Sequence, residues 1–389
     1  MPKLIYLDNH TITRPSAKAL EKMMPFFKEH WGAIESPHRM GQELIPAVDA
    51  AAAAIYEALG ADRSASFTFT SSGAEAISQV LFSTCLDTMR DSGRNHFLTT
   101  AVEEVPFLMA IKRLQKLDCH GKMLPLDTAG RLRTEVLEEA IKPRVAMLSL
   151  SMANSLTGVI QPISDLVRVC REKEILLHVD VSSVLGKIFF AFQDFGIDFL
   201  TFDGSLMHAP KGTGGVLVRK GLSLAPFIQG SPSFNVPLFI ALATAMEEMQ
   251  TKLDFLCTEI ARLRQKFEEE IVRALPDAVI LFQETDRLPN TSVIAFPGAS
   301  SEALLFSLQR KGIYASFGGK NSQHLSYILK TCGIAPELAL SALSFALSWE
   351  TTEEEIERAV EMIADSVRQI KRISGSICHA KESLRCDTV

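Results

Sequence analysis

A short buried strand that ends in an aspartate, set among other strand-like runs, constrains the fold of this chain most. Residues 175–180 read Ile-Leu-Leu-His-Val-Asp, and residues 163–174 before them have the apolar spacing of a helix. Further strand-like runs cover 145–150, 214–219 and 199–206, the last of which runs into a turn. Strands that alternate with helices build a parallel sheet. We therefore predict an α/β fold with a mostly parallel sheet.

The composition indicates a globular protein. The chain has 389 residues, of which 47% are hydrophobic, which allows a large core and two lobes. The net charge of −6 is spread along the sequence, so there is no basic stripe for nucleic acid and no polybasic membrane patch. The N-terminal residues lack the apolar region of a signal peptide, and no apolar run reaches the roughly 18–20 residues that cross a bilayer. We expect a cytoplasmic protein that binds neither nucleic acid nor membrane.

The cysteines argue for reduced thiols and against a metal site. There are seven, at positions 85, 119, 170, 257, 332, 378 and 386, and no two are spaced as Cys-x-x-Cys. Two of them precede histidines, in Cys119-His120 and Cys378-His379. Neither pair belongs to a set of four ligands at zinc spacing. We expect no bound metal.

Four motifs follow one another along the chain in a recognisable order. Residues 6–10 read Tyr-Leu-Asp-Asn-His, 69–75 read Phe-Thr-Ser-Ser-Gly-Ala-Glu, 178–180 read His-Val-Asp, and 203–206 read Asp-Gly-Ser-Leu. Together they resemble the cysteine desulfurases (NifS- and IscS-like) of the class V aminotransferase family. The resemblance implies the fold type I of pyridoxal-phosphate (PLP)-dependent transferases, with a mostly parallel sheet in a large domain and a small α+β domain. It also implies PLP as cofactor.

The long segment 236–275 is expected to close the large domain and lead into the small one. Thr351 and Glu354 form a capping box that opens a final packing helix. We place the large domain at residues 14–253, the small domain at 1–13 and 254–374, and a polar tail at 375–389.

The resemblance places the attachment point of the cofactor at Leu206. In the family the strand that corresponds to residues 199–206 ends in Ser-Gly-His-Lys. The lysine of this motif carries PLP as a Schiff base and moves the α-proton of the substrate. A leucine can do neither, so we expect that PLP is not bound as a Schiff base. Lys211 lies in Ala-Pro-Lys-Gly, where the family already has a separate lysine. We interpret Lys211 as structural, with replacement of the missing lysine as the alternative.

Two further catalytic positions are replaced. The sulfur-carrying cysteine of the family falls near Asn321, and no cysteine lies between Cys257 and Cys332. The arginine of the family's Ser-Ile-Arg-Phe-Ser motif, which binds the substrate carboxylate, falls on Ser344. Losing such a charge-assisted contact costs on the order of 1.5–3 kcal/mol. We therefore expect no catalytic residues at these positions.

The turn that would receive the cofactor phosphate is partly kept. In the family this strand-to-helix turn reads Phe-Thr-Ser-Gly-Ala-Thr-Glu-Ser and offers backbone N–H groups to the phosphate. Here Ser72 and Gly73 remain, and Ala74 replaces the threonine whose hydroxyl would bind, which leaves a serine as substitute. An ordinary serine-capped helix start explains the same pattern. The Gly-Thr pair from the neighbouring subunit becomes Phe234-Asn235, whose aromatic ring would fill the phosphate site.

The contacts to the cofactor ring are also changed. Glu104 replaces the stacking histidine, and a carboxylate cannot stack and would repel a phosphate. Ser155 replaces an asparagine, and Ser183 replaces a glutamine that donates to the ring oxygen. Asp180 is kept, either to pair with the pyridine nitrogen or as a strand-end carboxylate satisfied by N–H donors. The predicted remnant site comprises Ser72, Gly73, Ala74, Glu104, Ser155, Asp180, Ser183 and Ser205.

Three functions are compatible with this pattern. The leading hypothesis is a degenerate cysteine desulfurase-like homodimer that has lost the reaction and acts by binding a partner or a small molecule. The second is a working PLP-dependent enzyme that uses another lysine or holds PLP noncovalently, through Asp180, the N–H groups near Gly73, and Ser205. The third is an accessory interaction protein of iron–sulfur assembly, with a scaffold protein of that assembly as partner.

Overall fold

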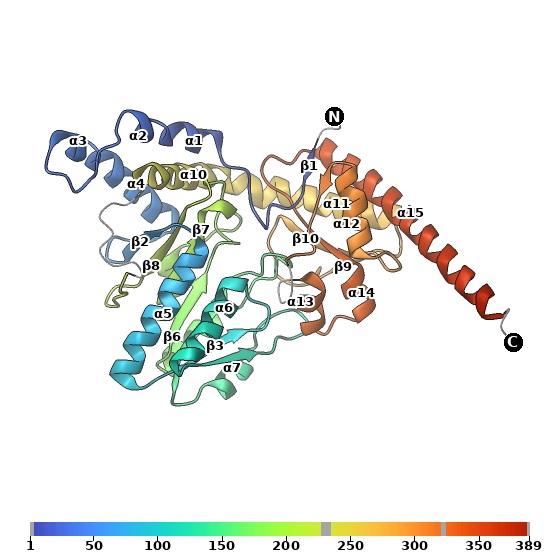
Figure 1. The fold of residues 1–389 in the computed structure, drawn as a ribbon, viewed down its shortest axis with the longest axis horizontal. Helices are drawn as coiled ribbons and strands as arrows, with labels where there is room; N and C mark the ends of the chain where they lie inside the picture. The colour runs from blue at the N-terminus through green and yellow to red at the C-terminus, as the bar shows by residue number, and fades with distance from the viewer. Residues whose placement is uncertain (1–3, 227–234, 320–323, 387–389) are drawn as a thin grey trace. The chain divides into compact units, whose positions relative to one another are not determined.

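The computed structural model describes residues 4–226, 235–319 and 324–386. The chain forms two compact units, and Figure 1 labels many of their elements. The large unit consists of residues 12–154 and 160–254, and the small unit consists of 1–11, 155–159 and 255–389. The domain bounds expected from the sequence stay a prediction.

A seven-stranded sheet forms the centre of the large unit, in the order β2-β8-β7-β6-β5-β3-β4. Its strands are β2 (Ser66–Thr70), β3 (His96–Thr100), β4 (His120–Leu124), β5 (Val145–Ser151), β6 (Leu176–Asp180), β7 (Phe199–Asp203) and β8 (Gly214–Val218). Strand β8 is antiparallel to both of its neighbours, and every other pair is parallel. The predicted mostly parallel sheet is confirmed.

The large unit also contains helices. They are α1 (Ala17–Met23), α2 (Pro25–Lys28), α3 (Arg39–Gln42), α4 (Ile45–Ala58), α5 (Gly73–Ser92), α6 (Val105–Leu114), α7 (Thr134–Ala140), α8 (Ile163–Glu172), α9 (Phe192–Phe195) and α10 (Val236–Phe255), with short 3₁₀ turns η1 (Gln115–Leu117) and η2 (Gly204–Leu206). Helix α5 packs on β7 and β8 and against α6. All residues of β5 and β8 are buried, as expected for strands that are covered on both faces.

The small unit contains two small sheets. Strands β9 (Val279–Leu281), β10 (Thr291–Ala295) and β12 (Ala342–Ala346) pair antiparallel in the order β12-β10-β9, and β1 (Ile5–Tyr6) pairs parallel with β11 (Ile313–Tyr314). Its helices are η3 (Leu256–Ile260), α11 (Ala261–Ala274), α12 (Ser301–Arg310), α13 (Leu325–Thr331), α14 (Pro336–Ser341) and α15 (Glu353–Cys386). The rings of Phe267 and Phe345 meet edge to face in its core, with centroids 5.2 Å apart.

Helix α15 begins near the predicted capping box. Thr352 Oγ1 accepts a hydrogen bond from the Glu355 backbone N–H at 3.3 Å, one residue later in the chain than the predicted pair Thr351 and Glu354. The helix continues to Cys386, into the segment 375–389 that the sequence predicts to be a polar tail.

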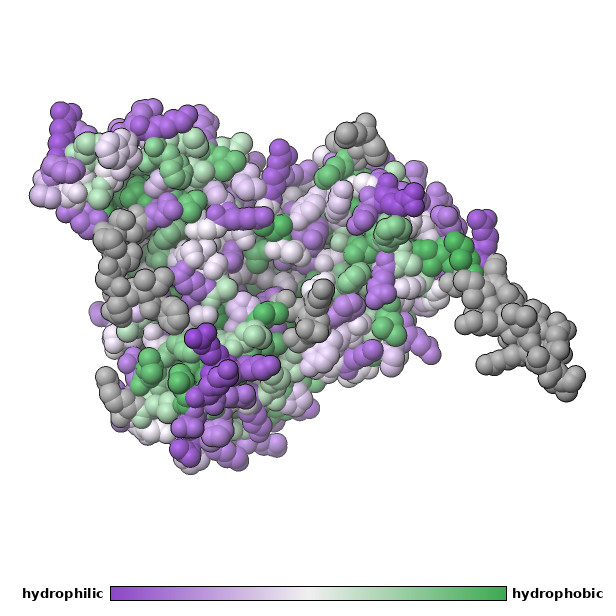
Figure 2. Space-filling view, viewed as in Figure 1, coloured by the Kyte–Doolittle hydropathy of each residue, from purple (hydrophilic) through white to green (hydrophobic). Residues whose placement is uncertain are grey.

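On the face shown in Figure 2, small apolar patches are separated by hydrophilic residues. Among residues 4–226, 235–319 and 324–386, no helix is both long enough and apolar enough to cross a membrane. Within the same ranges, no three His, Cys, Asp or Glu side chains are grouped as metal ligands.

Candidate cofactor site

The candidate site lies at the carboxyl ends of β6 and β7, which are neighbouring parallel strands of the large unit. Asp180 is the last residue of β6 and Asp203 is the last residue of β7. The 3₁₀ turn η2 follows Asp203 directly and contains Leu206. Open α/β sheets bind ligands at this end of their strands. The fold therefore places the aspartate and the predicted lysine position where a cofactor would bind.

The turn between β2 and α5 is held by protein carboxylates. Ser72 caps α5, and its side chain accepts a hydrogen bond from the Glu75 N–H at 3.2 Å. The Ser71 backbone N–H donates to Glu75 Oε2 at 2.8 Å. The Gly73 backbone N–H donates to Asp203 Oδ2, also at 2.8 Å. Two backbone N–H groups of this turn are thus already used, and Ala74 is exposed beside them.

Asp203 connects this turn to η2. Its Oδ1 accepts hydrogen bonds from the Ser205 backbone N–H at 2.9 Å and from Ser205 Oγ at 2.6 Å. Its own backbone N–H donates to Ser182 Oγ at 2.8 Å. A Cβ at Gly73 would lie 2.8 Å from the Asp203 Cβ, so only glycine allows this approach. The sequence analysis missed Asp203, although an acidic residue at the first position of the Ser-Gly-His-Lys motif was a visible signal.

Asp180 is buried and accepts two hydrogen bonds. Thr201 Oγ1 donates to Asp180 Oδ2 at 2.7 Å, and the Ser182 backbone N–H donates to Oδ1 at 3.1 Å. Burial raises the pKa of Asp180 to about 7, against the opposing effect of these donors, and the negative charge of Asp203 raises it further. Asp180 thus has two hydrogen-bond donors within the protein, the Thr201 hydroxyl and the Ser182 N–H, as expected for a strand-end carboxylate.

A buried chain of hydrogen bonds leads to Asp180. His178 Nε2 lies 2.9 Å from Thr201 Oγ1, and His178 Nδ1 lies 2.8 Å from Ser149 Oγ. Burial lowers the pKa of His178 to about 3, so the ring is neutral. Because Thr201 gives its only proton to Asp180, it accepts from His178, which assigns the ring proton to Nε2 and makes Ser149 the donor to Nδ1. This chain orients the Asp180 carboxylate without help from a ligand.

Two carboxyl groups, those of Glu103 and Glu104, follow β3. Glu103 is buried and accepts from Thr100 Oγ1 and from the Ser151 backbone N–H, both at 2.7 Å. Burial raises the pKa of Glu103 to about 7, and the charge of Glu104 adds to that rise. Glu104 is half-buried and occupies the N-cap position of α6 without a capping side-chain bond. A carboxylate therefore stands at the predicted stacking position.

The region around Leu206 contains a lysine that the sequence analysis missed. Leu206 is half-buried, and Lys187 Nζ donates to its carbonyl oxygen at 3.4 Å. The Lys187 side chain is buried, which lowers its pKa to about 8. Thr13 fixes the same turn, because its N–H and its hydroxyl each donate to the Ser205 carbonyl oxygen at 2.9 Å. Lys211 is exposed. A lone lysine in the apolar run 184–190 was the available signal.

The other predicted residues are divided between the two units. Ser183 is half-buried in the turn after β6, next to Ser182. Ser155 and Ser344 are buried in the small unit, where Ser344 Oγ donates to the Leu156 carbonyl oxygen at 2.6 Å. Asn321 lies outside the described residues, as does Phe234. Asn235 Oδ1 accepts from the Leu238 N–H at 3.1 Å, at the start of α10.

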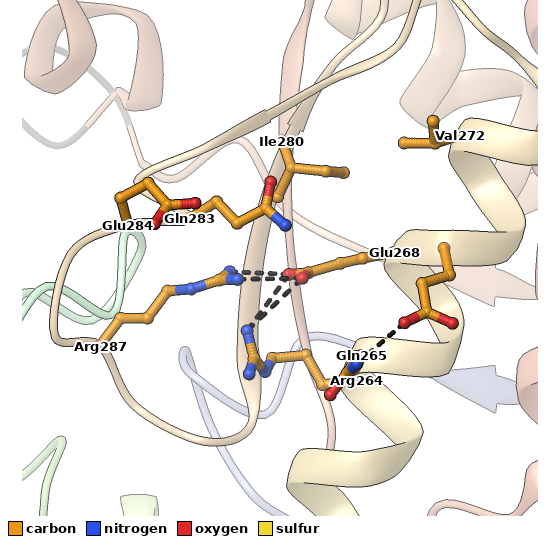
Figure 3. A pocket seen from close by; sticks show the side chains of 9 residues that line it. Arg264, Gln265, Glu268, Val272, Ile280, Gln283, Glu284 and Arg287 are labelled. Carbon is orange, nitrogen blue, oxygen red and sulfur yellow. Dashed lines mark hydrogen bonds and ion pairs between the residues drawn. The ribbon is translucent and has the colours of Figure 1, made fainter.

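A separate pocket of about 570 Å³ lies in the small unit, beside α11 and β9 (Figure 3). Arg287 forms a two-pronged ion pair with the buried Glu268, with N–O distances of 2.7 and 2.9 Å. Arg264 Nη1 adds a longer contact of 3.4 Å to the same carboxylate, and its Nε donates to the Pro289 carbonyl oxygen at 3.0 Å. The buried charges of this pocket are therefore paired with one another, which indicates a structural role.

Comparison with known proteins identifies the family. The family described as Aminotransferase class-V matches residues 5–235. The cysteine desulfurase of Gluconacetobacter diazotrophicus is 31% identical over 382 residues, 95% of each chain. A solved structure described as a NifS-like protein has a TM-score of 0.86 at 29% identity, and the match covers 93% of this chain and 98% of that one. The chain belongs to the class V aminotransferase family.

Within this family the chain is similar to cysteine desulfurases. Cysteine desulfurase NifS of Azotobacter vinelandii is 31% identical over 381 residues, 95% of this chain and 94% of the other. The predicted fold is confirmed as the fold type I of PLP-dependent transferases, with a mostly parallel seven-stranded sheet and a small antiparallel sheet. The family uses PLP, so the residues present can be compared with what PLP requires.

Proposed function

We propose that this chain is a cysteine desulfurase-like homodimer without desulfurase activity, which acts by binding a partner or a small molecule. One residue carries the proposal: Leu206, which the family motif predicts at the lysine position, lies in a turn fixed by Thr13, Ser205 and Lys187. A leucine side chain has no amine, so it can neither hold PLP covalently nor move a proton.

The residues around the turn before α5 support the proposal, because they do not fit a bound PLP phosphate. The Gly73 N–H donates to the Asp203 carboxylate, so this turn already faces a negative charge of the protein itself. A phosphate would meet like charges here, whereas PLP-binding turns offer unused N–H donors and positive charge.

The residue at the predicted substrate-binding position, Ser344, also supports the proposed loss of activity. Ser344 is buried in β12, and its hydroxyl donates to the Leu156 carbonyl oxygen at 2.6 Å. Its backbone is paired with Ser316. A buried serine whose proton is committed to a carbonyl oxygen cannot replace the two parallel donors of an arginine toward a carboxylate.

The test is desulfurase activity of the purified protein. Cysteine and PLP are supplied in excess, and sulfide and alanine are measured beside a heat-killed sample and an active cysteine desulfurase. We expect no release above the heat-killed sample. Release of both products in equal amounts would exclude the proposal.

The rival function, a working PLP-dependent enzyme with another lysine, is favoured by one observation. Lys187 Nζ lies 3.4 Å from the Leu206 carbonyl oxygen, and burial lowers its pKa to about 8, which makes the neutral amine accessible near neutral pH. If Lys187 took over, sulfide release would depend on it, and Lys187→Met would abolish the release while Lys211→Met would not. We expect neither variant to change a background that is already zero.

The class of partner follows from the resemblance alone. We propose a scaffold protein of iron–sulfur assembly, bound by the homodimer. Affinity capture with the purified chain as bait tests this, with a candidate scaffold protein added at known concentration. Recovery of the scaffold at micromolar concentration supports the proposal, and recovery no higher than with an unrelated bait refutes it.

A further inference from the structure

We propose that Asp203 is a built-in anion that takes the position of the cofactor phosphate, so that this carboxylate, and not only the missing lysine, excludes PLP. The inference deepens the proposed function and rests on its placement of the cofactor site. It names a second barrier that acts on the phosphate group, whereas the change at Leu206 acts on the aldehyde.

The first support is the position of the carboxylate at the start of α5. This helix has twenty residues, and the backbone N–H groups of its first turn attract anions. Asp203 Oδ2 accepts from the first of these groups, the Gly73 N–H, at 2.8 Å. An internal carboxylate thus makes the type of contact that a phosphate oxygen would make.

The second support is that Asp203 cannot easily turn away. Its other oxygen accepts from the Ser205 N–H and hydroxyl, at 2.9 and 2.6 Å. Its backbone lies at the end of β7, where it pairs with Gly214 of β8 and donates to Ser182 Oγ at 2.8 Å. Moving the carboxylate out of the turn would break three hydrogen bonds at once.

The third support is steric. The Asp203 Cβ approaches the Gly73 backbone so closely that an added Cβ would lie 2.8 Å away. Gly214, its partner in β8, approaches Ser72 in a similar way, since a Cβ there would lie 2.7 Å from the Ser72 carbonyl carbon. The end of the sheet is therefore packed against the turn, which leaves the N–H of Gly73 facing a side chain of this chain.

The negative charge of Asp203 determines how strongly it should weaken the binding of a phosphate group. Two unit charges about 4 Å apart at an effective dielectric constant of about 20 repel each other enough to weaken binding by about a thousandfold. Solvent and movement of the side chain reduce this, so we expect Asp203 to weaken binding of a phosphorylated ligand by about a hundredfold or more. We expect the charge of Asp203 to change the affinity of a ligand without phosphate very little.

The experiment compares PLP with pyridoxal, which lacks the phosphate. Leu206→Lys supplies the amine, and the comparison adds Asp203→Asn, which keeps the shape and removes the charge, or Asp203→Ser, which restores the motif's serine. Dissociation constants come from visible absorption of the Schiff base, checked by borohydride reduction and peptide mapping. Asp194→Asn, which removes an exposed carboxylate in the same unit, is the matched control in the Leu206→Lys background.

We expect the Asp203 variants to bind PLP at least about a hundredfold more tightly than Leu206→Lys alone, with pyridoxal affinity changed by less than about threefold. The Asp194 control should change neither. Equal PLP affinity with and without Asp203→Asn overturns the inference. If Leu206→Lys does not fold, noncovalent PLP binding by equilibrium dialysis is compared between the wild type and Asp203→Asn, with the same two outcomes. Neither failure bears on sulfide release by the wild type, so the proposed function is judged separately.

Discussion

Replacing Asp180 with asparagine should change how the stability of the protein depends on pH. Burial raises the pKa of Asp180 to about 7 in the folded state, from 3.8 as the ordinary value. The folded state therefore keeps a proton that the unfolded state has lost, between about pH 4 and pH 7. Because stability rises with pH only where the unfolded state binds more protons, this group lowers the stability as pH rises through that window.

The magnitude follows from the same values. Each pH unit between the two pKa values changes the free energy of unfolding by about 1.4 kcal/mol. From pH 5 to pH 7 the free energy of unfolding of the wild type should therefore fall by roughly 2–3 kcal/mol because of Asp180. The free energy of unfolding of Asp180→Asn should not show this fall. Asparagine cannot accept these two hydrogen bonds as a carboxylate does, so the variant is less stable by an amount that does not depend on pH. The test therefore uses the pH dependence of the difference in free energy of unfolding between the variant and the wild type.

The assay is urea unfolding of both proteins at pH 5, 6, 7 and 8. The difference in free energy of unfolding, variant minus wild type, should rise in favour of the variant by roughly 2–3 kcal/mol between pH 5 and pH 8. Glu103 and His178 titrate in both proteins, so their contributions cancel in this difference. A difference that stays constant within 0.5 kcal/mol over this range would refute the reasoning about burial. Asp194→Asn is measured in parallel as a control for the chemical change.

Two further predictions concern stability. Arg287→Met should destabilise the protein by about 3–5 kcal/mol in urea unfolding, because it leaves the buried Glu268 with the two longer contacts from Arg264. A loss no larger than that of Arg262→Met, which breaks the more exposed pairs with Glu259 and Glu353, would contradict this. Gly73→Ala should cost about 1–3 kcal/mol, because the new Cβ would lie 2.8 Å from the Asp203 Cβ; an unchanged midpoint of unfolding would show that the turn can move.

Much of the fold was predictable from the sequence, for reasons that the structure makes clear. The run 175–180 is apolar because β6 lies inside the sheet, and the helical spacing of 163–174 corresponds to α8, which packs on it. The antiparallel direction of β8 was not predicted. It follows β7 after a short turn and not after a crossover helix, which is the signature of an antiparallel neighbour.

The candidate site was less predictable, because its decisive contacts join distant segments. Gly73 and Asp203 are 130 positions apart, and only the fold shows that the carboxylate of one meets the N–H of the other. The position of Lys187 beside Leu206 depends on the path of the turn after β6, which apolar periodicity does not describe. The hydrogen bond from Ser344 to the Leu156 carbonyl oxygen could not be inferred from spacing either.

Whether the wild-type protein forms a covalent adduct with PLP decides most directly if the chain has lost the cofactor chemistry of its family. The protein is incubated with PLP, reduced with borohydride and mapped by peptide mass spectrometry, beside an active cysteine desulfurase. Surface lysines react slowly and in many places, so a specific site is one modified to near completion at equimolar PLP. We expect no such site and no visible Schiff-base band. Stoichiometric modification of one lysine, at Lys187, Lys211 or elsewhere, would contradict it.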